Sequence, residues 1–435
     1  MKSAFRDILL ENEFGAPARY FRRDVSAPLL PQKALAVIGV RRSGKTTFLR
    51  QLWDDLSRSR KVSPERLVHV NFFDERLFGL PAERLGELLE AYYEVHPDVP
   101  ARETLYFFLD EPQVIKGWEY FVDRLLRSHH RVFVSGSSAT LLSREIASAM
   151  RGRSLSVEMF PFSFRETLLA EKRPVSALGP RDRAAARIRL KKYLQQGGFP
   201  ETLSVTPSIR RLLLQDYLDV ILLRDVIERH NPSDPSAITA LLHLLMNQVG
   251  SFYTLNKTCE RLKAQGYKVN KPEISSALEW FHDSYLFFST PLFTASAQKR
   301  LVNPKKLYCI DPGMAHHHSQ SRSEDWGHLL ECAVFLHLRR RTELISYFKD
   351  ARQREVDFVA QQKDGTYRLV QVAWSLRDPK TRDREIQALQ SAMSELSLKT
   401  SLVVTFDEEE EIKLNGKIIS VQPAWSYLLN EHNGF

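Results

Sequence analysis

The order of apolar and polar positions near the start of the chain predicts a parallel sheet. Short apolar runs at residues 34–38, 67–73, 105–111 and 131–138 alternate with segments of helical pattern. Continuous apolar strands, each followed by a helix, are typical of a parallel sheet that helices bury on both faces. We therefore expect an α/β domain over residues 1–165.

The middle of the chain has helical spacing throughout. Apolar residues at helix spacing run up to a break at Asn231-Pro232, which predicts a helical lid or linker over 166–235. These residues are Leu214, Leu218, Ile221 and Leu222. Three short helical patterns and a lysine-rich connector then predict a winged helix-turn-helix over 236–300. The alternative is a small domain that packs on the α/β domain and touches no DNA.

From residue 301 to 435 strand and helix patterns mix, which predicts an α+β domain. The dipeptides Asp364-Gly365 and Asn415-Gly416 each separate two strand patterns and so predict β-hairpins. The acidic run Asp407–Glu411 fits a solvated loop, or a sheet edge that resists pairing with other strands.

A glycine-rich loop with the spacing GxxxxGK[S/T] follows the first apolar run, as GVRRSGKTT at residues 39–47. In this motif backbone N–H groups and the positive end of the following helix cradle phosphates, so Lys45 would reach the β- and γ-phosphates and Thr46 would hold magnesium. We therefore expect ATP and Mg²⁺ as cofactors. The expected nucleotide-binding residues are Gly39, Arg42, Ser43, Gly44, Lys45, Thr46 and Thr47.

A second motif, LYFFLDEPQ, ends an apolar strand pattern in Asp110-Glu111. An aspartate at such a strand end orders the magnesium shell, and an adjacent glutamate polarises the attacking water, so the pair predicts hydrolysis rather than binding alone. After the next strand pattern, Ser137 or Ser138 is a candidate sensor of the γ-phosphate. The alternative for both serines is a polar strand end.

Arginines beyond these motifs are candidates for a catalytic finger. A cation delivered to the γ-phosphate of a neighbouring subunit stabilises the charge of the transition state. Arg151 and Arg153 are the first candidates, and Arg224 is a weaker one. The role requires a homo-oligomer.

The charge balance favours a polyanionic partner, because the net charge is +9 and the sequence pI is about 9.3. We expect DNA, with four lysines of the predicted winged helix as candidate contacts. They are Lys257, Lys263, Lys268 and Lys271.

Other features of the composition predict no further site. No segment has the apolar length of a bilayer span and no secretory leader is evident, so we expect a cytoplasmic protein without membrane contact. Three scattered cysteines indicate inert thiols rather than disulfides or a zinc site. His316-His317-His318 is interpreted as a loop that holds no metal.

Several segments together resemble one large family of bacterial and archaeal ATP-binding proteins. They are GVRRSGKTT, FLDEPQ followed by Trp118, SGSSA, RGRS, PFSFRE, GGFPE, YCIDPG, LLE and EVDF. Members have an N-terminal AAA-type ATPase domain and a C-terminal domain of unknown function. The resemblance implies an AAA-type core, a winged-helix middle, a C-terminal module similar to restriction-endonuclease-like PD-(D/E)xK nucleases, and a ring of about six subunits.

The implied nuclease site is incomplete in this sequence. Such a nuclease needs an acid on a helix, an acid on a strand, and an acid-x-lysine pair on the next strand to bind metal and activate water. Glu331 and Asp357 fit the first two positions, but the next strand has Gln371 and Ala373 where an acid and a lysine are required. We expect a degenerate nuclease site that serves binding or assembly rather than cleavage.

Two functions are consistent with these features. One is an ATPase whose cycle moves or remodels DNA, including branched DNA of the kind met in repair, recombination or defence. The other is an ATP-dependent regulatory switch that acts on a protein partner. DNA-stimulated ATP turnover and steep salt dependence of DNA binding would distinguish the first from the second.

Overall fold

The structure is a computed structural model of the chain. It describes residues 1–11, 14, 19–59, 61–137, 152–173, 179–318 and 325–430. By its internal contacts the chain divides into unit 1, residues 1–159 with 283–285, and unit 2, residues 160–282 with 286–435. The division after Met159 lies close to the predicted end of the ATPase core at residue 165.

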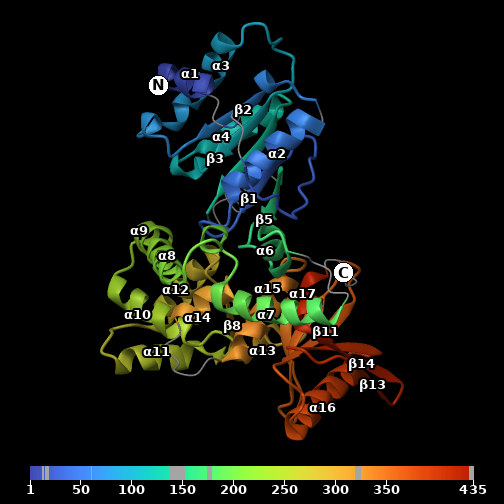
Figure 1. Ribbon diagram of the computed structural model, residues 1–435. Helices are drawn as coiled ribbons and strands as arrows, with labels where there is room; N and C mark the ends of the chain where they lie inside the picture. The colour runs from blue at the N-terminus through green and yellow to red at the C-terminus, as the bar shows by residue number, and fades with distance from the viewer. Residues whose placement is uncertain are drawn as a thin grey trace. The chain divides into compact units, whose positions relative to one another are not determined.

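Unit 1 is built on a five-stranded parallel sheet in the order β2-β3-β4-β1-β5 (Figure 1). Its strands are β1 (Ala34–Ile38), β2 (Leu67–Asn71), β3 (Tyr106–Asp110), β4 (Arg131–Gly136) and β5 (Ser154–Glu158). The first four match the four predicted strands. The prediction missed β5, because this edge strand is only partly buried and lacks a continuous apolar run.

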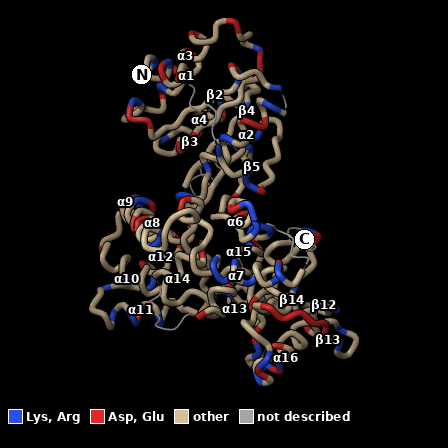
Figure 2. Tube along the Cα trace, viewed as in Figure 1, with Lys and Arg blue, Asp and Glu red and all other residues tan. Residues whose placement is uncertain are grey.

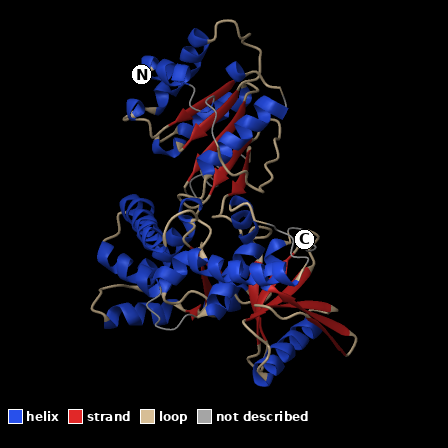
Figure 3. Ribbon diagram, viewed as in Figure 1, coloured by secondary structure: helices blue, strands red, loops and turns tan. Residues whose placement is uncertain are grey.

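Helices cover the sheet of unit 1 (Figure 3). They are α1 (Lys2–Glu11), α2 (Lys45–Ser59), α3 (Glu87–Val95) and α4 (Trp118–Arg127). Helix α2 buries Phe48, Leu52 and Trp53 in one cluster with Phe108 and Phe133 of the sheet. This packing holds the start of α2 at the end of β1, where the glycine-rich loop joins them.

Unit 2 begins with a group of helices. They are α6 (Phe164–Ala170), α7 (Pro180–Gln196), α8 (Pro207–Val220), a π-helical segment (Ile221–Ile227) and α9 (Glu228–His230). The chain then turns at Asn231, as the sequence predicts. Helix α7 contacts α14 (Pro312–His318), α15 (Trp326–Arg339) and α17 (Ala424–Leu429). Helix α7 of the segment predicted as a lid or linker therefore packs against helices from the later part of unit 2.

Three helices and a small antiparallel sheet follow. The elements run in the order α10 (Pro235–Met246), β6 (Phe252–Tyr253), α11 (Leu255–Ala264), α12 (Lys271–Asp283), β7 (Phe287–Thr290) and β8 (Lys305–Cys309), with α13 (Ala297–Val302) between the last two strands. Strand β8 pairs with both β6 and β7. The predicted boundary between residues 300 and 301 therefore cuts through one sheet, because β8 returns to complete it.

The C-terminal part of unit 2 contains a six-stranded mixed sheet in the order β13-β14-β12-β11-β10-β9. Its elements are β9 (Ile345–Lys349), β10 (Glu355–Gln361), β11 (Tyr367–Ala373), α16 (Pro379–Glu395), β12 (Thr400–Thr405), β13 (Glu410–Leu414) and β14 (Lys417–Pro423). Both predicted hairpins are present, between β10 and β11 and between β13 and β14. Asn415 and Gly416 both have positive φ, which a two-residue hairpin turn of this type requires.

Within the described residues, no helix combines the length and the apolar character that crossing a bilayer would need.

Candidate functional site

The glycine-rich loop leaves the carboxyl end of β1 and enters α2 at Lys45. Gly39 has φ +146°, and a Cβ there would lie 2.2 Å from the carbonyl oxygen of Met159, so only glycine lets the two backbones approach this closely. Gly44 has φ +91° just before the helix begins. The loop therefore has the backbone shape that brings consecutive N–H groups to a helix N-terminus, as phosphate binding requires.

Lys45 lies inside this loop. Its Nζ donates hydrogen bonds to the carbonyl oxygens of Gly39 at 3.2 Å and Val40 at 3.1 Å, and the residue is 6% exposed. Thr46 is exposed at the first turn of α2, which contains no acidic residue that would repel an anion. These groups fit the phosphates and the magnesium ion of a nucleotide.

Asp110 ends β3 and faces Ser135 on the neighbouring strand β4. The Ser135 hydroxyl donates to the Asp110 carboxylate, and Ser135 Oγ accepts the backbone N–H of Glu111 at 3.2 Å. Because neighbouring parallel strands end at one edge of the sheet, Asp110 and the loop after β1 share the carboxyl edge. Ser135 was missed by the sequence analysis, which considered only the serines that follow it.

Glu111 has left-handed backbone angles, φ 54° and ψ 43°. This conformation costs a residue other than glycine about 1–2 kcal/mol, so a glutamate is retained there against its own preference. Its carboxylate accepts a hydrogen bond from the Gln113 side chain. A strained residue next to the magnesium-binding position is a candidate for the water-polarising role.

Arg23 is a further residue of this site that the sequence analysis did not select. Its guanidinium donates to the carbonyl oxygen of Ser43 at 2.7 Å, and its backbone exchanges hydrogen bonds with the Gln51 side chain. Arg23 is 5% exposed, so the segment before β1 braces the glycine-rich loop against α2. No motif marks this arginine, and only its position in space relates it to the loop.

Two of the other predicted catalytic residues, Ser137 and Arg153, lie in the part of unit 1 that the structure describes. Ser138 and Arg151 lie outside the described residues, and Ser137 is buried just after β4. Arg153 pairs with Asp123 at 3.4 Å and precedes β5, about 15 Å from the carboxyl edge at the rise of a five-residue strand. An Arg153 finger would therefore have to act on another subunit.

The structure also describes Arg224 and three further residues of the glycine-rich loop and the start of α2. Arg224 pairs with Glu228 on its own helical segment at 2.7 Å. Arg42 is exposed with φ 65°, Ser43 is fully buried and donates to the Val40 carbonyl oxygen, and Thr47 is half-buried on α2. Of these, Ser43 contributes to the loop shape rather than presenting its side chain to a ligand.

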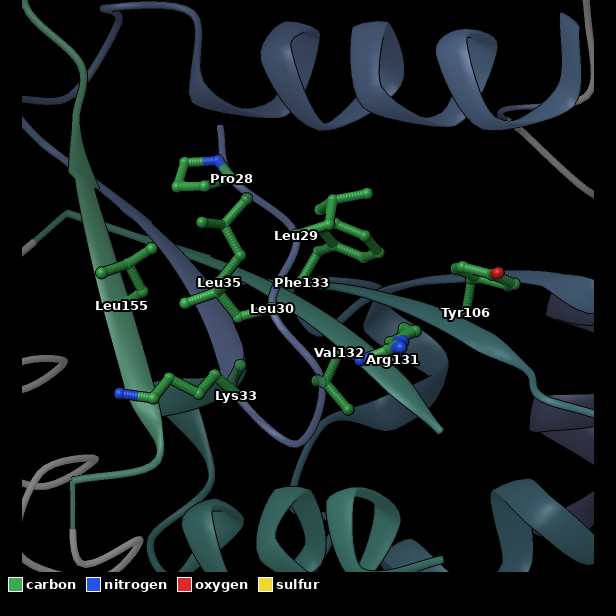
Figure 4. Close-up of a pocket in the computed structure, with 11 residues that line it drawn as sticks. Pro28, Leu29, Leu30, Lys33, Leu35, Tyr106, Arg131, Val132, Phe133 and Leu155 are labelled. Carbon is green, nitrogen blue, oxygen red and sulfur yellow. The ribbon is translucent and has the colours of Figure 1, made fainter. Parts of the chain in front are cut away.

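A cavity of about 80 Å³ lies at the amino ends of the strands (Figure 4). Its lining includes Leu35 of β1, Tyr106 of β3, Arg131 of β4 and Leu155 of β5. The glycine-rich loop is at the opposite ends of the same strands. This cavity is therefore not the nucleotide site.

A second cluster of charged groups lies in unit 2. The ammonium of Lys306 on β8 contacts three carboxylates: Glu331 at 2.8 Å, Glu355 at 2.8 Å and Asp357 at 2.7 Å. Lys306 is 5% exposed. The sequence predicted Glu331 and Asp357 but not Lys306, which comes from the small sheet rather than from the strand where a lysine was sought.

Burial and neighbouring charges shift the pKa values of Glu331 and Lys306. Tyr308 donates to Glu331 at 2.6 Å, while burial and the nearby Asp357 raise the pKa of Glu331. Three carboxylates raise the pKa of Lys306 well above its usual range against the opposing effect of burial. Among the described residues, no group of three or more His, Cys, Asp and Glu side chains is arranged to hold a metal ion. The carboxylates converge on an ammonium instead.

Both the oxygen and the nitrogen of the Gln371 side-chain amide form hydrogen bonds. Its oxygen accepts the backbone N–H of Asp357 at 3.0 Å, and its nitrogen donates to Glu385 on α16 at 2.7 Å. Ala373, two residues along on β11, packs in the apolar core beneath α16. Glu355 and Glu385 were both missed, because neither has the spacing of the sought motif.

The motif segments GGFPE and YCIDPG meet at a buried carboxylate in unit 2. Asp311 accepts the N–H of Gly198 at 2.7 Å and the N–H of Met314 at 2.9 Å. A Cβ on Gly197 would lie 1.9 Å from Asp311 Oδ1, and one on Gly313 would lie 2.3 Å from the backbone of Gln196. Asp311 thus joins the two segments through backbone hydrogen bonds. Glycine is required at 197 and 313 because a side chain there would collide with the other segment.

Burial raises the pKa of Asp311 from 3.8 to about 6. The folded chain therefore holds this proton more tightly than the unfolded chain, and the associated stability is present below pH 4 and lost as the pH rises through 6. Two pKa units correspond to about 3 kcal/mol. We expect the difference in free energy of unfolding between wild type and Asp311→Asn to fall by up to that amount between pH 4 and 7.5. A difference that does not change with pH would exclude this role.

Two smaller predictions are resolved by the structure. His316, His317 and His318 form the last turn of α14 rather than a loop, and His318 Nε2 lies 3.0 Å from the Gln215 side-chain oxygen on α8. The cysteines are free and buried, and burial raises the pKa of the Cys309 thiol to about 12, which agrees with inert core thiols. The lysines Lys257, Lys263, Lys268 and Lys271 are all exposed on or beside α11 and α12.

The chain is 34% identical over 446 aligned residues to an uncharacterized protein of Methanocaldococcus jannaschii, an alignment that covers 98% of this chain and 96% of the relative. The chain belongs to the family of this archaeal protein. An uncharacterized protein of Haemophilus influenzae is 27% identical, over 78% of this chain and 82% of its own length. The family therefore has members in archaea and bacteria.

Family models agree with this membership along most of the chain. The model described as an AAA domain matches residues 31–168. Two domains of unknown function, DUF8612 and DUF4143, match residues 187–325 and 326–427. The AAA match supports ATP binding and ATPase activity by unit 1, and it covers the loop, Asp110 and Glu111.

Solved structures are less similar. A Walker-type ATPase of Pyrococcus abyssi is 14% identical with a TM-score of 0.41, over 73% of this chain and 94% of that chain. Cdc6p of Pyrobaculum aerophilum is 14% identical with a TM-score of 0.23, over 66% of this chain and 86% of that chain. Neither carries a functional argument here.

Proposed function

We propose that this protein is a Mg²⁺-dependent ATPase that binds DNA and remodels it or moves along it. The arrangement of Asp110, Glu111 and Ser135 at the carboxyl edge of the sheet, beside Lys45 and Thr46, carries the ATPase part. Thr46 and Asp110 would hold the ion, which neutralises charge on the phosphates when bound. Glu111 would orient and polarise the attacking water.

Support for a DNA partner comes from unit 2 and from net charge. The order of α10, β6, α11, α12, β7 and β8 supports the proposal of a winged helix, and Lys257, Lys263, Lys268 and Lys271 are exposed there. A net charge of +9 favours phosphate contacts. We propose that these elements bind the DNA backbone, without preference for a base sequence.

We further propose that the C-terminal domain is a degenerate nuclease fold used for binding. Gln371 bonds to the backbone of Asp357, and the carboxylates of Asp357 and Glu331 both pair with the ammonium of Lys306. A buried ammonium repels a metal ion of the same sign. Hydrolysis of DNA by this domain is therefore not part of the proposal.

An Arg153 finger and a homo-oligomer, a ring of about six subunits, complete the proposed ATPase. Normal turnover by Arg153→Ala under conditions in which the protein is oligomeric would contradict the finger role.

A regulatory switch acting on a protein partner is the alternative function. The observation that favours it is the convergence of the nuclease-like carboxylates on Lys306, since a domain without metal chemistry is free to serve as a docking platform.

Replacing Lys45 with Ala is expected to weaken ATP binding at least tenfold. The ammonium would make charge-assisted hydrogen bonds to the β- and γ-phosphates, and each such bond contributes about 1.5–3 kcal/mol. Titration calorimetry with a non-hydrolysable ATP analogue measures the loss. Lys33→Ala, which removes an exposed lysine before β1, is the control and should bind normally.

The experiment that tests the whole proposal is the ATPase rate in the presence of single-stranded, duplex, forked and four-way DNA at several salt concentrations. The proposal predicts stimulation by at least one of these DNAs, with a steep loss as salt increases. An ATPase rate that no DNA changes would favour the regulatory switch.

A further inference from the structure

Four arginines from two distant parts of the chain meet the acidic run Asp407–Glu411 in unit 2. They are Arg183 and Arg187 on α7, Arg377 before α16, and Arg382 on α16. Arg187 lies 3.2 Å from Asp407, Arg377 lies 3.5 Å from Asp407 and 3.4 Å from Glu408, and Arg183 lies 3.9 Å from Glu409. Arg382 pairs with Glu410. We call these four residues the arginine face.

The acidic run is more than a solvated loop. It connects β12 to β13, which is the edge strand of its sheet, and Figure 2 shows it as a continuous acidic segment there. Glu408 fixes the run in place, because it accepts the Leu376 N–H at 2.7 Å and the Ser375 hydroxyl at 2.7 Å. The side chains of its neighbours Asp407, Glu409 and Glu410 pair with these arginines.

The run is a dense series of negative charges, as a nucleic acid strand is. All five of its residues are acidic, and a DNA strand carries about one negative charge per 3.4 Å of axis. The arginines are planar donors suited to phosphate as well as to carboxylate, and they stay charged at any physiological pH. A surface that accepts one of these polyanions has the chemistry to accept the other.

The arginines of these ion pairs are largely exposed, whereas among the carboxylates Glu409 is 67% exposed and Asp407 20%. The side chains of Arg183, Arg187 and Arg377 are 53%, 41% and 76% exposed. Exposed pairs contribute little to stability, because water competes for both charges and salt screens them. Exchanging the acidic run for an external polyanion is therefore possible without unfolding the domain.

We propose that the arginine face is a binding surface for a DNA backbone, and that the acidic run covers it as an internal competitor. This inference rests on the proposed function, since it adds a second DNA-binding surface to the one proposed for the winged-helix elements. DNA would displace Asp407, Glu409 and Glu410 from the arginines while Glu408 keeps the base of the run in place.

The test compares three full-length proteins. The first is the wild type. The second, called the neutralised run, carries Asp407→Asn, Glu409→Gln and Glu410→Gln. These changes free the arginines without removing Glu408. The third is a matched control with the same change in net charge at exposed sites elsewhere, Glu75→Gln, Asp98→Asn and Glu395→Gln. Binding of a fluorescent 30-base-pair duplex is measured by anisotropy between 50 and 300 mM salt.

The neutralised run is expected to bind the duplex at least tenfold more tightly than the control at low salt. Its plot of log affinity against log salt should be steeper by about 2 to 3, because each phosphate newly contacted adds about 0.9 to the slope. Adding Arg187→Ala and Arg377→Ala to this variant should remove most of the gain, which locates the effect on the arginine face.

Equal binding by the neutralised run and the control would overturn the inference, because the gain would then reflect net charge alone. A neutralised run that binds poly-glutamate but no DNA would also overturn it, and would indicate an acidic protein partner. If the duplex binds as expected but never changes the ATPase rate, the inference stands and the proposed function fails. If the duplex stimulates wild type and neutralised run equally at equal affinity, only the inference fails.

Discussion

Replacing Glu111 with Gln is expected to lower the ATP turnover rate by about 10²- to 10⁴-fold and to leave ATP affinity within about threefold. Removing a general base has effects of this size, since the amide still accepts a hydrogen bond but no longer takes up a proton. Glu111 follows Asp110, which keeps its bond from Ser135 in the variant, so the magnesium-binding position is unchanged.

The measurement pairs phosphate release under saturating ATP with calorimetric ATP affinity. Glu119→Gln, the same chemical change on α4, is the control and should hydrolyse ATP normally. The left-handed backbone at residue 111 strains Gln and Glu alike, so the thermal stability of the variant should equal that of the wild type. Full hydrolysis by Glu111→Gln would show that the water-polarising role is misassigned.

Replacing Lys306 with Met is expected to lower the free energy of unfolding by about 3–5 kcal/mol. Removing one partner of a buried ion pair leaves the other charge without compensation, and here Glu331, Glu355 and Asp357 would be left together. The side chain volume is nearly unchanged, so the loss reports charge rather than a cavity.

The pH dependence distinguishes this explanation from loss of packing. Without the ammonium, which lowers it, the pKa of Glu331 rises further through burial and repulsion by Asp357, so the variant should regain stability as the pH falls from 7 to 5. Urea unfolding at both pH values measures this. Lys305→Met, the preceding and more exposed residue of β8, should be nearly neutral. A Lys306→Met protein as stable as Lys305→Met would contradict the role.

Adjacent residues in the chain were sufficient to predict much of unit 1. The continuous apolar runs of β1 to β4 predict buried strands, because a strand buried on both faces has few polar positions. The loop from Gly39 to Lys45 and the pair Asp110-Glu111 are equally local. Strand β5 was missed because an edge strand exposes part of its surface and loses that signature.

Contacts between distant segments could not be predicted in this way. Lys306 lies 25 residues from Glu331 and 51 from Asp357, and comes from a sheet other than the one that holds Asp357. Arg187 and Asp407 are 220 residues apart. Arg23 acts on the loop through space and belongs to no motif.

Local sequence was thus enough to establish the parallel sheet, the phosphate-binding loop and the acid pair, because the backbone shape of each depends on residues within one strand and one turn. Folding alone established which charge meets which. The residues next to a lysine, an arginine or a carboxylate in the sequence do not reveal its ionic partner. That partner depends on which strands and helices pack together. Tertiary structure alone brings Lys306 to Glu331 and Asp357. It also brings Ser135 to Asp110 and the four arginines to the acidic run.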